Sequence, residues 1–240
     1  QAHALPAVSF MAGHSLGEYA ALVCAEALDF TEAIRLVQTR GRLMQQFVPL
    51  GQGAMAAIVG LTDEQVEQLC AQVSQAGERV TPANYNAIGQ VVVAGHHAAV
   101  LRLIAAAEAA QARLAALIPV SVPCHCELLR DMSAAFLAQL NGVSVQVPRI
   151  PVIRNVDASP YTTAEEIRPY LAKQLYSPVQ WVKSIQTLIS RGVTHFIECG
   201  PGQVLSGLIK RIERTVPTIC VNEPSGLEKA CLLWGNHHDF

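Results

Sequence analysis

A serine flanked by two glycines is the first feature of this sequence that could carry chemistry. Residues 13–17 read GHSLG, between the apolar stretch PAVSFMA and an alanine-rich run. At a strand-to-helix junction this G-x-S-x-G pattern is typical of a nucleophile elbow, whose tight turn requires small residues at Gly13 and Gly17. We therefore expect Ser15 to be a nucleophile and the N–H of Leu16 to face an oxyanion. The alternative is a plain turn in which Ser15 only caps the helix.

A serine nucleophile needs a base, and His125 is the histidine best placed for that role. It follows the apolar stretch IPVSVP and precedes a helical stretch, so it lies at the carboxyl end of a strand, where parallel sheets bind ligands. A histidine that merely caps a helix is the alternative. His14 adjoins the serine and is expected to point the other way. Cys124 and Cys126 would point away from His125 in an extended segment, so we expect no metal site there.

A single arginine interrupts an apolar stripe on the second expected helix. The stripe consists of Leu36, Arg40, Leu43 and Phe47, which follow one another at helical spacing. A guanidinium on such a face needs a carboxylate, because an unpaired buried charge is very costly. That carboxylate is either an internal acid or an acid on the substrate held bidentately, and the sequence leaves both open.

The elements that must position these residues alternate between strand and helix, which predicts an α/β fold. The strands are expected at 6–12, 53–60, 79–86, 90–95, 114–122, 151–156, 194–200 and 218–222, and the helices at 16–28, 31–48, 62–74, 96–112, 127–141, 163–176, 178–191 and 203–213. The middle of the chain follows the order β-α-β-β-α-β, the ferredoxin-like unit. We expect residues 51–125 to form this small subdomain, inserted in a parallel-sheet domain made of residues 1–50 and 126–240.

The composition excludes several function classes. The net charge is −2, which argues against a nucleic-acid binder, and no apolar run reaches the roughly 18–20 residues of a membrane-spanning helix. Seven scattered cysteines fit a reducing compartment better than a disulfide framework. We therefore expect a cytoplasmic protein without nucleic-acid or membrane partners.

Several motifs together resemble a known enzyme family. They are GHSLGEYAALV, TRGRLMQ, GAMAAIVGL, GQVVVAG, PVSVPCHC, QLYSPVQW, ECGPGQVL and VNEP, in order and spacing from about Pro6 to Pro224. The chain resembles the malonyl-CoA:acyl carrier protein transacylases, and this implies an α/β-hydrolase-like domain with a ferredoxin-like insertion. It also implies ping-pong transfer of malonyl from coenzyme A to the phosphopantetheine thiol of acyl carrier protein in fatty acid biosynthesis. Malonyl-CoA is then a substrate, and no cofactor is expected.

The resemblance also assigns roles to individual residues. Ser15 matches the nucleophile, His125 the base and Arg40 the arginine that holds the malonyl carboxylate. Gln174 matches the residue whose main-chain carbonyl orients the histidine, in place of a triad acid. His14 and Cys124 are expected at the substrate site. Because bacterial members often carry serine before the histidine, Cys124 is expected to shift acyl selectivity or histidine positioning slightly.

The resemblance is incomplete at its start. The family begins with a strand and a glutamine-bearing loop that supplies a second oxyanion donor, whereas 14 residues precede Ser15 here. We therefore expect this polypeptide alone to be weakly active or inactive. The rival interpretations are a serine hydrolase or thioesterase of similar fold, a catalytically impaired fragment, and an acyltransferase of a polyketide pathway.

Basic side chains gather on two late helices and suggest where an acidic carrier would dock. They are Lys210, Arg211 and Arg214 after a GPG turn, and Lys183 and Arg191 on the preceding helix. A solvated helix face is the alternative. The GPG turn at 200–202 admits a phosphate at the helix start, although a plain turn explains it equally well.

Overall fold

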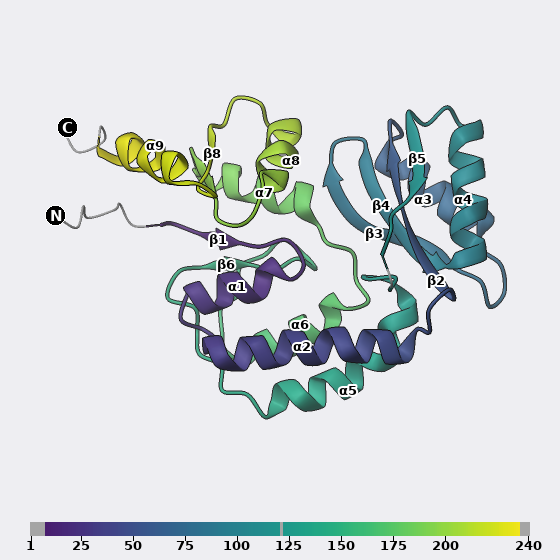
Figure 1. Ribbon diagram of the computed structural model, residues 1–240, viewed down its shortest axis with the longest axis horizontal. Coiled ribbons are helices and arrows are strands. Elements are labelled where there is room, and N and C mark those ends of the chain that lie inside the picture. Colours follow the sequence, from purple (N-terminus) through teal and green to yellow (C-terminus); the bar gives the residue numbers. More distant parts are fainter. Residues whose placement is uncertain (1–7, 121, 236–240) are drawn as a thin grey trace.

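The chain folds into two parts that lie side by side (Figure 1). The structure is a computed structural model and describes residues 8–120 and 122–235. Residues 6 and 7 of the first expected strand and residue 121 of the fifth lie outside the described residues. The larger part carries the short strands β1, β6, β7 and β8, and the smaller part carries β2 to β5. The predicted α/β class is confirmed.

The larger part contains two parallel strand pairs surrounded by helices. Strand β1 (Met11–Ala12) pairs with β6 (Val152–Ile153), and β7 (Phe196–Glu198) pairs with β8 (Thr218–Cys220). The helices are α1 (Gly17–Cys24), α2 (Phe30–Phe47), α5 (Arg130–Asn141), α6 (Ile167–Gln174), α7 (Trp181–Ser190), α8 (Val204–Ile212) and α9 (Pro224–Gly235), with a 3₁₀ turn, η1, at Glu127–Leu129. Parallel pairing is as expected, but within the described residues the pairs are separate and shorter than the apolar runs suggested. No helix of the described chain is both long and apolar enough to cross a membrane.

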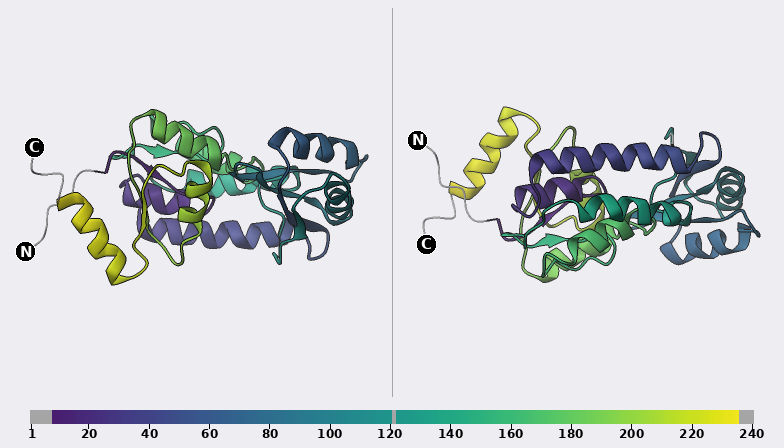
Figure 2. Two further views of the ribbon diagram at one scale, coloured as in Figure 1. Left: turned by 90° about the horizontal axis from the view of Figure 1, so that it is seen from above. Right: turned by 90° about the horizontal axis from the view of Figure 1, so that it is seen from below.

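The smaller part is an antiparallel sheet with two helices on one face (Figure 2). Its strands are β2 (Gly53–Val59), β3 (Val80–Ala87), β4 (Gln90–His96) and β5 (Leu114–Leu117), and its helices are α3 (Asp63–Val73) and α4 (His97–Ala109). The sheet order β3-β4-β2-β5, read with the chain order β-α-β-β-α-β, is the ferredoxin-like arrangement. The boundaries at residues 50 and 126 stay a prediction.

Strict alternation along the strands decides which residues face each layer. Ala54, Ala56 and Ile58 of β2 pack with α3 and α4, whereas Met55 between them faces the other way, in a cluster with Cys126 of the larger part. This is the period of two that a pleated strand imposes. The inner face of the small sheet therefore lies directly against the segment that carries His125.

Backbone hydrogen bonds also join the two parts. Val179, just before α7, donates to the carbonyl of Ala83 and accepts from the N–H of Tyr85. The chain of the larger part thus pairs with the edge strand β3 of the smaller one. This pairing fixes how the small sheet sits over the segment that carries His125.

Candidate active site

The tight turn at Ser15 joins β1 to α1. Ser15 has a φ of +52°, a left-handed conformation that is costly for a residue with a side chain. A Cβ on Gly13 would lie 2.0 Å from the carbonyl carbon and oxygen of Gly17, so only glycine fits. A Cβ on Gly17 itself would meet nothing within 4 Å. The expectation that Gly17 must be small is therefore wrong, because its open side faces away from the turn.

Ser15 and His125, distant in sequence, meet at one end of the parallel strands. Ser15 Oγ lies 2.7 Å from His125 Nε2, and His125 Nδ1 lies 2.7 Å from the carbonyl oxygen of Gln174. Because a carbonyl only accepts, Nδ1 carries the proton and Nε2 is free to accept the serine hydroxyl. The carbonyl of Gln174 thus fixes the tautomer that a general base needs.

His125 has a left-handed backbone, with a φ of +59°. The backbone is therefore not extended at His125 itself, which was the condition for the reasoning about the two cysteines. Cys124 and Cys126 nevertheless both pack against the inner face of the small sheet. The turn at His125 points its ring back toward Ser15, which a straight strand would not do.

Burial keeps the His125 imidazole neutral. The side chain is 2% exposed, and desolvation, reinforced by the positive charge of Arg40, lowers its pKa to about 3. The hydrogen bond to the Gln174 carbonyl opposes this shift only in part. A neutral imidazole is the form that removes a proton from a serine or a thiol.

Arg40 reaches the nucleophile from α2. The residue is 7% exposed, and its Nη2 lies 3.3 Å from Ser15 Oγ. Among the described residues it has no carboxylate partner, and its Nε has no hydrogen-bond acceptor. The internal acid considered from the sequence is thus not found in the described chain. A buried, unpaired cation beside a nucleophile fits a substrate that brings its own carboxylate.

The remaining expected site residues surround this dyad. None of the hydrogen bonds between described residues takes the N–H of Leu16, which follows the nucleophile. His14 Nε2 lies 2.7 Å from Asn86 Oδ1, and the ring packs on Trp181. The Cys124 thiol is partly buried, and burial raises its pKa, an effect that Arg40 reduces. The substrate roles of His14 and Cys124 stay predictions.

Comparison with known proteins identifies the family. A family model described as an acyl transferase domain matches residues 6–223. A curated relative from Escherichia coli O157:H7, named malonyl CoA-acyl carrier protein transacylase, is 47% identical over 233 residues, 97% of this chain and 75% of that protein. The chain belongs to the malonyl CoA-acyl carrier protein transacylase family.

Solved structures of transacylases share the fold. The malonyl CoA-acyl carrier protein transacylase of Coxiella burnetii is 43% identical with a TM-score of 0.93, covering 95% of this chain and 72% of that one. A malonyl-transacylase solved in complex with a type II PKS acyl-carrier protein is 45% identical with a TM-score of 0.93, covering 96% and 74%. The resemblance inferred from the motifs is therefore confirmed.

Two buried residues of this transacylase site were missed from the sequence. Asn155, just after β6, accepts the N–H of Ser15 at 2.6 Å and donates to the carbonyl of Gly13 at 2.7 Å. Glu18, in the first turn of α1, receives hydrogen bonds from three groups. Asn155 lies two residues after the strand that pairs with the elbow strand, but nothing local in the sequence gives that pairing.

The helix start after the GPG turn is already occupied. The buried carboxylate of Glu198 accepts the N–H groups of Leu205 and Ser206 at 2.9 and 2.7 Å. It therefore satisfies the donors that a phosphate would need. The idea of a phosphate at the GPG turn is wrong for this reason.

The basic side chains after that turn are exposed. Lys210, Arg211 and Arg214 all face solvent, and so do Lys183 and Arg191. Arg211 Nη1 also donates to Gln90 Oε1 of the small sheet at 2.5 Å. Arg211 thus links the two parts of the transacylase fold as well as presenting charge.

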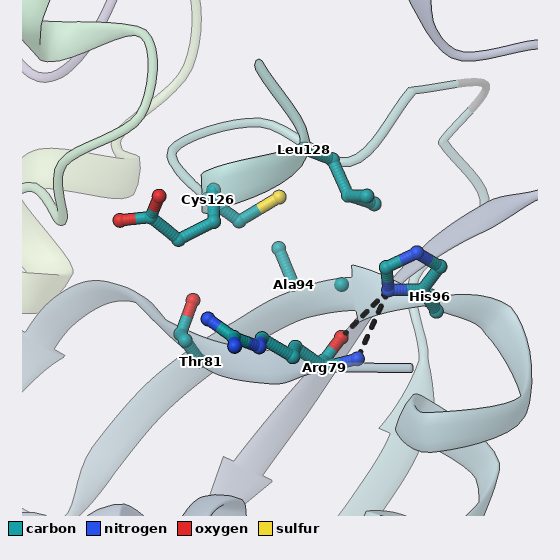
Figure 3. A pocket seen from close by; sticks show the side chains of 8 residues that line it. Arg79, Thr81, Ala94, His96, Cys126 and Leu128 are labelled. Carbon is teal, nitrogen blue, oxygen red and sulfur yellow. Dashed lines mark hydrogen bonds between the residues drawn. The ribbon is translucent and has the colours of Figure 1, made fainter. Parts of the chain in front are cut away.

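A hollow lies where the small sheet meets the segment that follows His125 (Figure 3). It is lined by Arg79, Thr81, Ala94, Gly95, His96, Cys126, Glu127 and Leu128. The N–H of Arg79 donates to His96 Nδ1 at its edge, and the Cys126 side chain closes it from the larger part. None of Ser15, His125 and Arg40 lines this hollow, so it is separate from the place where these three residues meet.

Proposed function

We propose that this chain transfers malonyl from malonyl-CoA to the phosphopantetheine thiol of acyl carrier protein, in fatty acid biosynthesis. The observation that carries the proposal is the meeting of three groups: Ser15 Oγ, His125 Nε2 and a buried guanidinium of Arg40 without a carboxylate partner among the described residues. The first two supply a nucleophile and its base. The third selects an acyl group that carries a carboxylate.

The first half-reaction acylates the serine. His125 Nε2 takes the proton of Ser15 Oγ while Oγ attacks the thioester carbonyl of malonyl-CoA. The oxyanion that forms faces the N–H of Leu16, the donor expected at an elbow. The carbon–sulfur bond then breaks, and coenzyme A leaves as a thiol with the proton that His125 returns. The product is a malonyl ester of Ser15.

The second half-reaction uses the same groups in reverse. His125 takes the proton of the carrier's phosphopantetheine thiol, and the thiolate attacks the malonyl ester. The carbon–oxygen bond breaks, Ser15 recovers its proton from His125, and the carrier leaves with a malonyl thioester. Throughout, Arg40 pairs with the free malonyl carboxylate, whose geometry suits a guanidinium fork.

A hydrolase of similar chemistry is the main rival. It would release the acyl group to water, and it has no need for a cation in its acyl pocket. The unpaired Arg40 favours transfer of an acid-bearing acyl group over simple ester hydrolysis.

Intact-protein mass spectrometry tests the proposal. Mixing the protein with malonyl-CoA should add one malonyl group at Ser15, stable in buffer and discharged by holo acyl carrier protein. The Ser15→Ala variant, which keeps His125 and Arg40, should show no adduct. Rapid loss of the adduct to water without carrier would instead support the hydrolase, and no adduct on the unmodified chain would support an impaired fragment.

Location and cofactor use follow from the same proposal. All seven cysteines lie in the described chain and all are free thiols, which supports a reducing compartment such as the cytoplasm. The proposed reaction needs no cofactor, since malonyl-CoA is consumed as substrate.

The polyketide pathway remains the second candidate, because one similar structure is a malonyl-transacylase with a type II PKS carrier. Parallel loading of a fatty acid carrier and a polyketide carrier distinguishes the two.

A further inference from the structure

A buried carboxylate lies directly behind the catalytic dyad. Glu18 is 1% exposed, and its two oxygens accept three hydrogen bonds. The Tyr161 hydroxyl donates at 2.6 Å, the side-chain amide of Gln174 at 2.6 Å, and the main-chain N–H of Asn155 at 3.2 Å. The mechanism derived above does not use this group, although burying a carboxylate is costly.

Two of these three partners also hold the reacting groups. The main-chain carbonyl of Gln174 fixes His125 Nδ1, and its side-chain amide reaches the carbonyl of Ser15 at 3.1 Å. The Asn155 side chain bridges the carbonyl of Gly13 and the N–H of Ser15, and so closes the left-handed turn. One carboxylate thus anchors both the residue that orients the base and the residue that braces the nucleophile.

We propose that Glu18 is a positioning residue for the transfer reaction, holding His125 through Gln174 and Ser15 through Asn155. The inference rests on the proposed function. In a catalytic triad the acid hydrogen-bonds the imidazole directly. Here Glu18 acts on His125 indirectly, through Gln174. Because the dyad bonds must stay within a few tenths of an ångström, loss of this anchor lowers the rate of chemistry rather than substrate binding.

The network requires the ionised form of Glu18. All three partners donate, whereas a protonated carboxyl would aim its own O–H at one of these donors. Burial raises the pKa of Glu18 to about 7, Asp157 adds to this rise, and the three hydrogen bonds oppose it. The other titratable neighbours, Tyr19 on α1 and Tyr161, have pKa values raised above the usual range of a phenol, so they stay neutral.

The pH dependence follows from the pKa values of Glu18 and His125. Glu18, with a pKa of about 7, changes charge near neutral pH, whereas His125, with a pKa of about 3, does not. As pH falls through about 7, Glu18 takes a proton and the rate falls to a lower plateau. This plateau extends to pH values below the usual pKa of histidine, because His125 stays neutral there. The acid limb of the profile therefore reports Glu18.

Glu18→Gln tests the assignment, because it keeps the shape and turns one accepting oxygen into a donor. We expect kcat per active site to fall about 10- to 100-fold, with the KM for malonyl-CoA unchanged and no acid limb near neutral pH. Glu108→Gln, the same change at an exposed site on α4, is the matched control and should match the unmodified protein.

Tyr161→Phe is the second variant, in case Glu18→Gln does not fold. It removes one donor to the carboxylate, and since that hydrogen bond lowers the pKa of Glu18, its loss raises this pKa. The acid limb should therefore move to higher pH. A purely structural role of the cluster would lower the melting temperature and leave the limb where it was.

The rate at which phenylmethylsulfonyl fluoride labels Ser15 measures the reactivity of the dyad without malonyl-CoA. Slower labelling in Glu18→Gln supports the positioning role even if the unmodified protein does not transfer malonyl, a result that would overturn only the proposed function. Unchanged labelling and an unmoved acid limb in folded variants would overturn the positioning role.

Discussion

At the residue scale, the role proposed for Arg40 is to select the acyl group that the site accepts. Replacing Arg40 by alanine removes the proposed partner of the malonyl carboxylate, so kcat/KM for malonyl-CoA should fall about 100-fold or more. The value for acetyl-CoA should not fall, because acetyl has no carboxylate to lose. Arg42→Ala, an exposed arginine on the same helix, is the matched control. Steady-state kinetics with both thioesters measure the ratio, and an unchanged malonyl preference would contradict the assignment.

The residues proposed to carry the reaction were predictable from sequence because each has a local signature. Ser15 lies in an elbow motif, His125 follows an apolar run, and Arg40 interrupts an apolar stripe. Glu18 and Asn155 have no such signature, since their roles depend on contacts between segments 137 residues apart. What the sequence could not supply was the pairing of β1 with β6, which brings those segments together.

At the element scale, the junction of β1 and α1 depends on one glycine rather than two. Gly13→Ala places a Cβ 2.0 Å from the backbone of Gly17, so it should destabilise the fold by at least about 2 kcal/mol. Gly17→Ala is the matched control, because its Cβ meets open space and alanine favours a helix by up to about 1 kcal/mol. Urea unfolding monitored by circular dichroism compares them, and equal stabilities would contradict the steric reason.

The secondary-structure elements also show where the hydrophobic pattern of the sequence predicts an element correctly and where it does not. The alternation in β2 and β4 was readable because each face of the small sheet meets a different layer. The short strands β1 and β6 look longer in sequence, since apolar residues continue past the paired backbone. Helix α9 was not expected at all, although Pro224 at its first position is a start signal.

At the scale of the whole molecule, contacts between the two parts hold the small sheet beside the segment of His125. The small sheet packs against the segment of His125, and backbone bonds from Val179 to β3 fix its position. Arg211 adds a side-chain link to Gln90 across the same boundary. Charge reversal at Arg211 would therefore disturb the boundary as well as the basic surface, and it is a poor test of carrier docking.

Lys210 offers the cleaner test of carrier docking. It is exposed on α8, and no hydrogen bond or ion pair ties its side chain to another described residue. If α8 attracts an acidic carrier, Lys210→Glu should raise the KM for carrier about three- to tenfold, and less so at high salt. Acylation of Ser15 by malonyl-CoA should not change, because that half-reaction precedes carrier binding. Lys229→Glu on α9, at the end far from the small sheet (Figure 1), is the matched control. An equal effect of both reversals would show that net charge, rather than the α8 surface, governs the encounter.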